Sequence, residues 1–128
     1  MIELRVLGTL DLRDGSTNRS VKSVLAQPKR MALFCYLALA TPHGAHRRDK
    51  LLLLFWPDSA DDRARNSLNQ AVFNLRRSLG ETAILATGEE VRLGEDVGCD
   101  VVAFEEALAA NDAQRALSLY GGDLLPGF

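Results

Sequence analysis

Apolar and polar positions change their period several times along the chain. Residues 2–6 alternate between apolar and polar side chains, and Leu10 and Leu12 repeat this period of two beyond Gly8. Such alternation predicts short antiparallel strands with one buried face. A turn is expected at Asp14 and Gly15, and residues 24–26 form a further candidate strand.

Three helices are predicted next, over residues 28–40, 47–56 and 61–80. Pro28 suits the first helical position, residues 41–44 end the first helix and Pro57 ends the second. Ser59 or Asp61 is the expected N-cap of the third helix. In the second helix we expect these apolar side chains to be buried: Leu51, Leu52, Leu54 and Phe55.

Residues 84–86 and 90–93 flank the turn residues 87–89 and predict a β-hairpin. Strands, three helices and a hairpin in this order predict an α+β winged helix-turn-helix domain over residues 1–97, with the hairpin as its wing. The helical period then returns on two segments hinged at Asn111 and Asp112. Residues 98–128 are therefore expected to be the start of a helical domain, truncated at a turn-rich, apolar end.

The third predicted helix has an unusual polar face. At about 100° per residue, five polar side chains fall within an arc of about 80°: Arg63, Asn66, Gln70, Asn74 and Arg77. Another side is apolar, and residues 63–80 contain no acidic side chain. Amide and guanidinium groups pair with adenine and guanine edges in the major groove, so this face predicts base readout. The alternative is an ordinary amphipathic surface helix.

Charge is distributed unevenly, although the net charge is only −2. Residues 1–80 carry 13 basic and 7 acidic side chains, whereas residues 81–128 carry 2 basic and 10 acidic ones. This asymmetry favours a basic part that faces nucleic acid, joined to an acidic part with a different role.

Other chemistry finds little support in the sequence. Cys35 and Cys99 form no CxxC motif, and Cys35 is expected in the core. His43 and His46 lack further ligands for a metal site. No nucleophilic triad or Gly-rich phosphate loop is present, so we expect neither an enzyme nor a cofactor. The chain shows no signal peptide or membrane span, which favours a soluble, cytoplasmic protein.

Several short motifs occur in order along nearly the whole chain: MIELRVLG (1–8), QPKR (27–30), LFWPD (54–58), RNSL (65–68), LRRSLG (75–80) and YGGDLLPGF (120–128). In this order they resemble the N-terminal region of SARP-type bacterial activators, where an OmpR/PhoB-like winged helix precedes a bacterial transcriptional activator domain. The resemblance implies promoter DNA binding, often as a homodimer on direct repeats, with recruitment of RNA polymerase. The hairpin tip departs from the family because Glu89 and Glu90 make it acidic.

In a winged helix the third helix lies in the major groove, which assigns roles to its side chains. Gln70 and Asn74 are the first candidates for base readout, flanked by Asn66, Asn69 and Arg77. Each could instead bond only water or phosphate. The candidate phosphate contacts are Lys29, Arg30, Arg47, Arg48, Arg63, Arg65, Arg76 and Arg92. For the basic side chains at the starts of the first two helices, extension into solvent is the alternative.

Phe73 lies at the edge of the polar arc. Core packing is the preferred interpretation, and packing against the wing or a thymine methyl group are the alternatives. Asp58 and Asp61 lie in the acidic loop before the third helix, which the resemblance identifies as a polymerase contact.

The leading hypothesis is therefore a DNA-binding transcriptional regulator. Its rival is a protein-interaction module, in which the winged helix is a scaffold and the acidic helical hairpin binds a partner.

Overall fold

The chain is a mixed α+β protein in a computed structural model that describes residues 2–14, 19–40, 44–120, 122 and 124. The strands are β1 (Ile2–Arg5), β2 (Asp11–Asp14), β3 (Arg19–Ser20), β4 (His46–Arg47), β5 (Ile84–Thr87), β6 (Glu90–Leu93) and β7 (Val97–Cys99). The helices are α1 (Lys22–Leu25), α2 (Pro28–Leu39), α3 (Arg48–Phe55), α4 (Asp61–Leu79), α5 (Asp100–Ala109) and α6 (Ala113–Leu119). The predicted turn residue Gly15 and helix stop at 41–43 lie outside the described residues.

The predicted pair of opening strands is confirmed. β1 pairs antiparallel with β2, in a register that places Leu4 opposite Leu12, and both side chains are fully buried. β1 also pairs in parallel with β7, so the sheet has the order β3-β2-β1-β7. The predicted domain boundary after Val97 falls within β7, and the division into two domains stays a prediction.

The prediction of a strand over residues 24–26 is wrong, because this segment lies in and just after the short helix α1. The N–H of Ala26 donates to the carbonyl of Lys22 at 2.9 Å, which closes a helical turn and leaves only Val24 buried. Four helices therefore precede the hairpin among the described residues, rather than three. Segments of three or four residues are too short for their apolar period to separate helix from strand.

α3 begins one residue after the predicted start at residue 47 and ends one residue before the predicted end at residue 56. Arg47 belongs to β4 and is the N-cap of α3. Leu51 is fully buried, but Leu54 is 50% exposed, which contradicts its predicted burial. The helix packs mainly on α4 and β4, so only one side of its leucine run is covered.

α4 begins at Asp61 as predicted, ends one residue earlier than predicted, at Leu79, and is capped differently. Its N-cap is Ala60, whose side chain makes no capping bond, so neither Ser59 nor Asp61 has that role. The carboxylate of Asp62 instead accepts from the N–H of Arg63 at 2.9 Å, which satisfies a free donor of the first turn. Gly80 follows the helix at φ 111°, a conformation that favours glycine.

The core is formed by buried side chains of β1, β2, the helices α1 to α4, β5 and β6. α4 contributes five buried side chains: Ala64, Leu68, Ala71, Val72 and Leu75. Leu68, Ala71, Val72 and Leu75 belong to the same cluster as fully buried Phe34 of α2 and Ile84 of β5. Packing of this stripe fixes which side of α4 faces outward.

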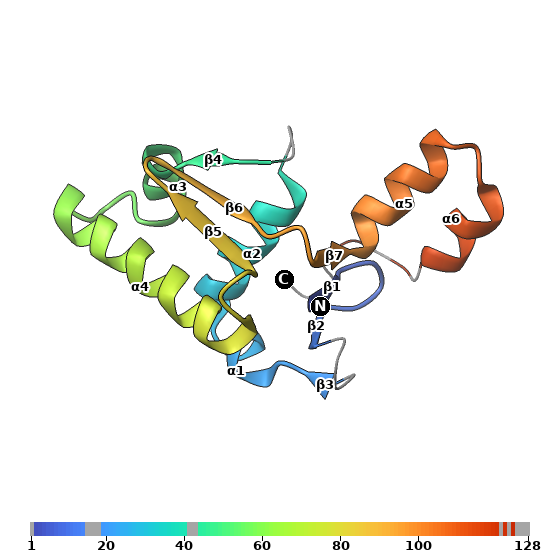
Figure 1. Cartoon of the computed structure of the whole chain (residues 1–128), viewed down its shortest axis with the longest axis horizontal. Coiled ribbons are helices and arrows are strands. Elements are labelled where there is room, and N and C mark those ends of the chain that lie inside the picture. Colours follow the sequence, from blue (N-terminus) through green and yellow to red (C-terminus); the bar gives the residue numbers. More distant parts are fainter. Residues whose placement is uncertain (1, 15–18, 41–43, 121, 123, 125–128) are drawn as a thin grey trace.

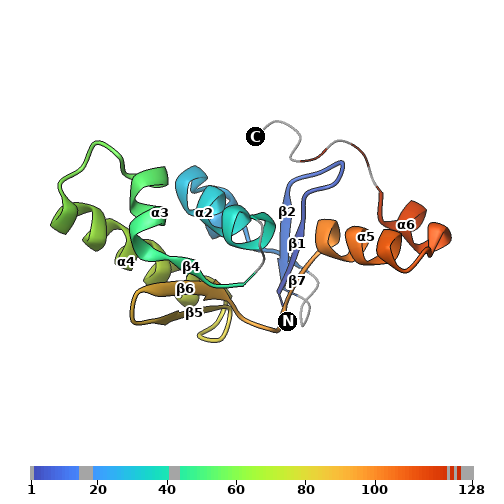
Figure 2. The same cartoon turned by 90° about the horizontal axis from the view of Figure 1, so that it is seen from above.

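The predicted hairpin is confirmed as β5 paired antiparallel with β6, and β4 extends it to the order β4-β6-β5. Figures 1 and 2 show this small sheet beside α3 and α4, at one end of the molecule. Gly94 follows it where a Cβ atom would collide with the carbonyl of Thr82. Glycine is therefore required where the chain turns towards β7.

The helical hairpin is also confirmed. α5 and α6 pack together, and the hinge contains Asn111 at φ 57° and Asp112, whose carboxylate caps α6. α5 and α6 lie on the side of the β1–β2–β7 sheet opposite to α2 (Figures 1 and 2). The carboxylate of Asp100 accepts from the N–H groups of Val6 and Leu7 at 3.0–3.1 Å, which fastens the start of α5 to the chain after β1.

Substitution of Leu68 by alanine should lower the free energy of unfolding by about 2–5 kcal/mol, because it opens a cavity beneath α4. The matched control is Leu53→Ala on α3, whose side chain is 73% exposed. Urea denaturation should show a change of less than about 0.5 kcal/mol for this control. Equal losses in the two variants would contradict the assigned orientation of α4.

Candidate nucleic-acid interface

The polar face of α4 is exposed over most of its length. Asn66, Asn69, Gln70 and Arg77 are all exposed, and no acidic side chain occurs from Arg63 to the end of the helix. Asp61 and Asp62 in the first turn complement the positive end of the helix dipole, as Arg76 and Arg77 complement the negative end. The central surface of α4 therefore offers amide and guanidinium groups without competing carboxylates.

Asn74 differs from the other predicted base readers. Its side chain is half-buried, and its amide nitrogen donates to the backbone carbonyl of Gln70 at 2.9 Å. Bonding back to the preceding turn is a local alternative that short polar side chains often take in helices. Gln70 and Asn66 are thus more accessible for base contacts than Asn74.

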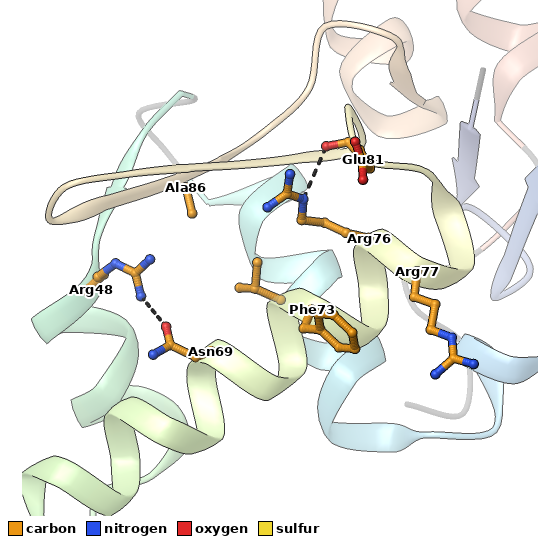
Figure 3. A pocket seen from close by; sticks show the side chains of 8 residues that line it. Arg48, Asn69, Phe73, Arg76, Arg77, Glu81 and Ala86 are labelled. Carbon is orange, nitrogen blue, oxygen red and sulfur yellow. Dashed lines mark hydrogen bonds between the residues drawn. The ribbon is translucent and has the colours of Figure 1, made fainter.

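Arg48 joins three elements on one side of this face. Its backbone N–H donates to the carbonyl of Glu89 at 2.7 Å, and its Nε donates to the carbonyl of Gly88 at 3.1 Å. A terminal guanidinium nitrogen donates to Oδ1 of Asn69 at 2.8 Å (Figure 3). The hairpin turn and α4 are therefore held in register by a residue predicted from sequence only as a phosphate contact.

The start of α2 borders α4 on another side. Lys29, Arg30 and Gln70 line a common hollow of about 170 Å³ together with Trp56. Nζ of Lys29 lies 5.4 Å from the centre of the Trp56 ring, a cation–π arrangement that orients the lysine. The structure thus brings two predicted phosphate contacts next to a predicted base reader. Trp56 is half-buried.

The remaining predicted phosphate contacts are distributed around these elements. Arg63 and Arg65 are exposed on the first half of α4. Nε of Arg76 donates to the carbonyl of Glu81 at 3.3 Å, which directs this side chain towards the segment before β5. Arg47 pairs with Asp49 at 3.6 Å, and Arg92 is exposed on β6 on the same strand face as Glu90. Acidic neighbours therefore weaken the positive potential at Arg47 and Arg92.

Phe73 is the functional candidate that the sequence placed wrongly. The preferred expectation was core packing, but the side chain is 64% exposed. It lines a hollow of about 630 Å³ with residues of α3, α4, the segment before β5 and the hairpin: Arg48, Asn69, Val72, Arg76, Arg77, Glu81 and Ala86. The helical period places Phe73 beside the polar arc, and this position was the one signal in the sequence that the ring is exposed.

The candidate polymerase contacts lie on the loop before α4 and at the first residue of α4. Asp58 is exposed in the turn after α3, and Asp61 is the first residue of α4 and is also exposed. Both carboxylates are therefore accessible to a partner.

The two thiols are not activated. Burial, together with the neighbouring Cys99, raises the pKa of Cys35 to about 12, and burial also raises the pKa of Cys99. Cys35 is buried as expected. Within the part of the chain that the structure describes, no three His, Cys, Asp or Glu side chains are grouped to hold a metal ion, and His43 lies outside that part. None of the described helices is long and apolar enough to cross a membrane.

Comparison of the sequence with protein-family models and with curated proteins gave no match.

Replacement of Arg48 by alanine should loosen the hairpin against α4. Loss of its side-chain bonds to Gly88 and Asn69 should make amides paired between β5 and β6 exchange about fivefold faster, which corresponds to ~1 kcal/mol. Native-state hydrogen exchange measures this directly. Arg47→Ala is the matched control, because the Arg47 side chain is exposed and pairs with Asp49. Equal exchange rates in both variants would rule out the bridging role.

Proposed function

We propose that this chain binds duplex DNA sequence-specifically through α4, as the promoter-binding part of a bacterial transcriptional activator. The observation that carries the proposal is the exposed face of α4, where Asn66, Gln70 and Arg77 lie on a surface without carboxylates. Such groups read adenine and guanine edges in the major groove. A face built only for solvation would be expected to carry glutamate and lysine instead.

We further infer that residues 1–97 form a winged helix-turn-helix. The order of α2, α3 and α4 followed by a β-hairpin supports this, as does the contact between α3 and α4. In helix-turn-helix proteins the second helix of the motif enters the major groove while the preceding helix crosses the backbone. In a winged helix-turn-helix of this kind, α4 would be the helix that enters the groove.

Phosphate contacts would come from the start of α2 and from α4 itself. Lys29 and Arg30 border it at the start of α2, and Arg63 and Arg65 lie on its first half. Contacts of this kind position a protein on DNA without reading sequence. Arg47 and Arg92 have acidic neighbours and would contribute less, so the acidic hairpin tip would stand clear of the DNA.

The rival function is protein binding by the helical hairpin. Leu108 of α5 is 54% exposed and Leu117 of α6 is 75% exposed, so this acidic part offers apolar side chains to a partner. In an activator, the same surface would suit RNA polymerase or a second copy bound to the neighbouring direct repeat. In the rival scheme the helical hairpin is the functional part, the winged helix is only a scaffold, and α4 does not bind DNA.

Affinity for a preferred duplex, selected from a random pool, should fall linearly with salt on logarithmic axes, with a slope of about 0.9 per phosphate contact. Arg65→Ala should reduce the slope by about one contact. Gln70→Ala should leave the slope unchanged but reduce discrimination at one base pair by about 1–3 kcal/mol. Fluorescence anisotropy titrations at several salt concentrations measure both quantities.

Matched controls lie on α6, where Arg115→Ala and Gln114→Ala remove the same side chains from an exposed surface far from α4. These variants should bind like the unmodified protein. Failure to bind any duplex at low salt would overturn the proposal and favour the rival. The spacing of half-sites in the selected pool reports whether two copies bind direct repeats.

The double variant Asp58→Asn, Asp61→Asn should lower transcription from a promoter that carries the preferred site. Its DNA affinity should stay within about twofold, because one surface charge at a helix start is worth a few tenths of a kcal/mol. In vitro transcription with purified polymerase gives the first quantity and anisotropy the second. The double variant Glu89→Gln, Glu95→Gln is the charge-matched control, because it removes two exposed carboxylates outside the loop before α4. Unchanged transcription in the Asp58→Asn, Asp61→Asn variant would remove the polymerase contact.

A further inference from the structure

Phe73 occupies the middle of the exposed surface of α4. Its neighbours one helical turn away are Asn69 and Gln70 on one side and Arg76 and Arg77 on the other, because side chains three and four residues apart lie next to each other on a helix. Figure 3 shows the ring on α4 between Asn69 and Arg77. An apolar ring is thus surrounded by amide and guanidinium groups.

Two neighbours of the ring are held in place, while the ring itself is open. Asn69 is held by Arg48 at 2.8 Å, and Arg76 is held by the carbonyl of Glu81 at 3.3 Å. Val72, the preceding residue, is buried in the core and anchors the helix beneath. Phe73 is 64% exposed, and none of the aromatic pairs among the described residues includes it. Its apolar surface is therefore available to a ligand.

We infer that Phe73 is a specificity-determining residue that packs against the C5-methyl group of a thymine in the major groove. This inference rests on the proposed function of α4. The thymine methyl is the apolar feature of the base edges in that groove, and aromatic side chains are among those that contact it. Arg77 and the amide groups around the ring favour base edges and phosphates as the immediate neighbours of that methyl group.

Charge argues against a second copy of the chain as the occupant. A symmetric contact through Phe73 would bring Arg76 and Arg77 of one copy against the same residues of the other, because both copies use the same patch in a twofold interface. Like charges brought together in this way oppose association. Glu81 is the one acidic residue that lines the hollow, against three arginines. DNA carries the complementary charge.

Substitution of single thymines by deoxyuridine tests the inference, because deoxyuridine lacks only the methyl group. In the preferred duplex we expect one or two positions at which this change weakens binding by about threefold to fivefold, the value of burying one methyl group. Phe73→Ala should bind the thymine and deoxyuridine duplexes equally at those positions. Phe73→Leu should retain part of the discrimination, since leucine is also apolar.

Gln70→Ala is the control variant, because it should relax a neighbouring base pair and leave the deoxyuridine effect intact. Phe73→Ala should fold normally, given its exposure, and circular dichroism with urea denaturation checks this.

Specific binding without any deoxyuridine effect would overturn this inference and leave the proposed function standing. An undiminished effect in Phe73→Ala would do the same. Phe73→Ala could instead lose cooperative binding to two half-sites while it still discriminates thymine from deoxyuridine. That result would assign the ring to a contact between copies and would also overturn the inference. Absence of duplex binding would overturn both proposals.

Discussion

Burial of one apolar stripe of α4 is the constraint on which the rest of the structure depends. Leu68 and Leu75 are fully buried, in the same cluster as Phe34 of α2. Burial of this stripe fixes the rotation of α4 about its own axis, so the side chains on the opposite arc face outward. The exposure of Asn66 and Gln70 is therefore a consequence of core packing.

Arg48 links this packing to the polar surface. Its bonds to Gly88 and Asn69 join the hairpin turn, the start of α3 and the middle of α4 through one side chain. A guanidinium has five donors, so these bonds leave others free. Arg76 likewise bonds to the backbone of Glu81. Basic side chains around α4 thus have positioning roles, whatever they contact in solution.

Long periodic segments were predictable from sequence because many residues contribute to each pattern. This holds for α2, α4 and the α5–α6 pair, whereas the β5–β6 hairpin was predictable from the turn residues between its two short strands. Some short elements were not predictable: β7 consists of three residues including Gly98, and its pairing with β1 spans most of the chain. The exposure of Leu54 was missed for a related reason, since an eight-residue helix shows too little of its period to separate covered leucines from uncovered ones.

The sequence by itself determined the order of the main elements, the polar arc of α4 and the separation of basic and acidic parts, because periodicity and charge are local properties. Tertiary structure decided which groups on that arc are available. Packing left Phe73 exposed, and Arg48 of α3 engaged Asn69 of α4. These outcomes depend on contacts between segments distant in the chain, which no local pattern encodes.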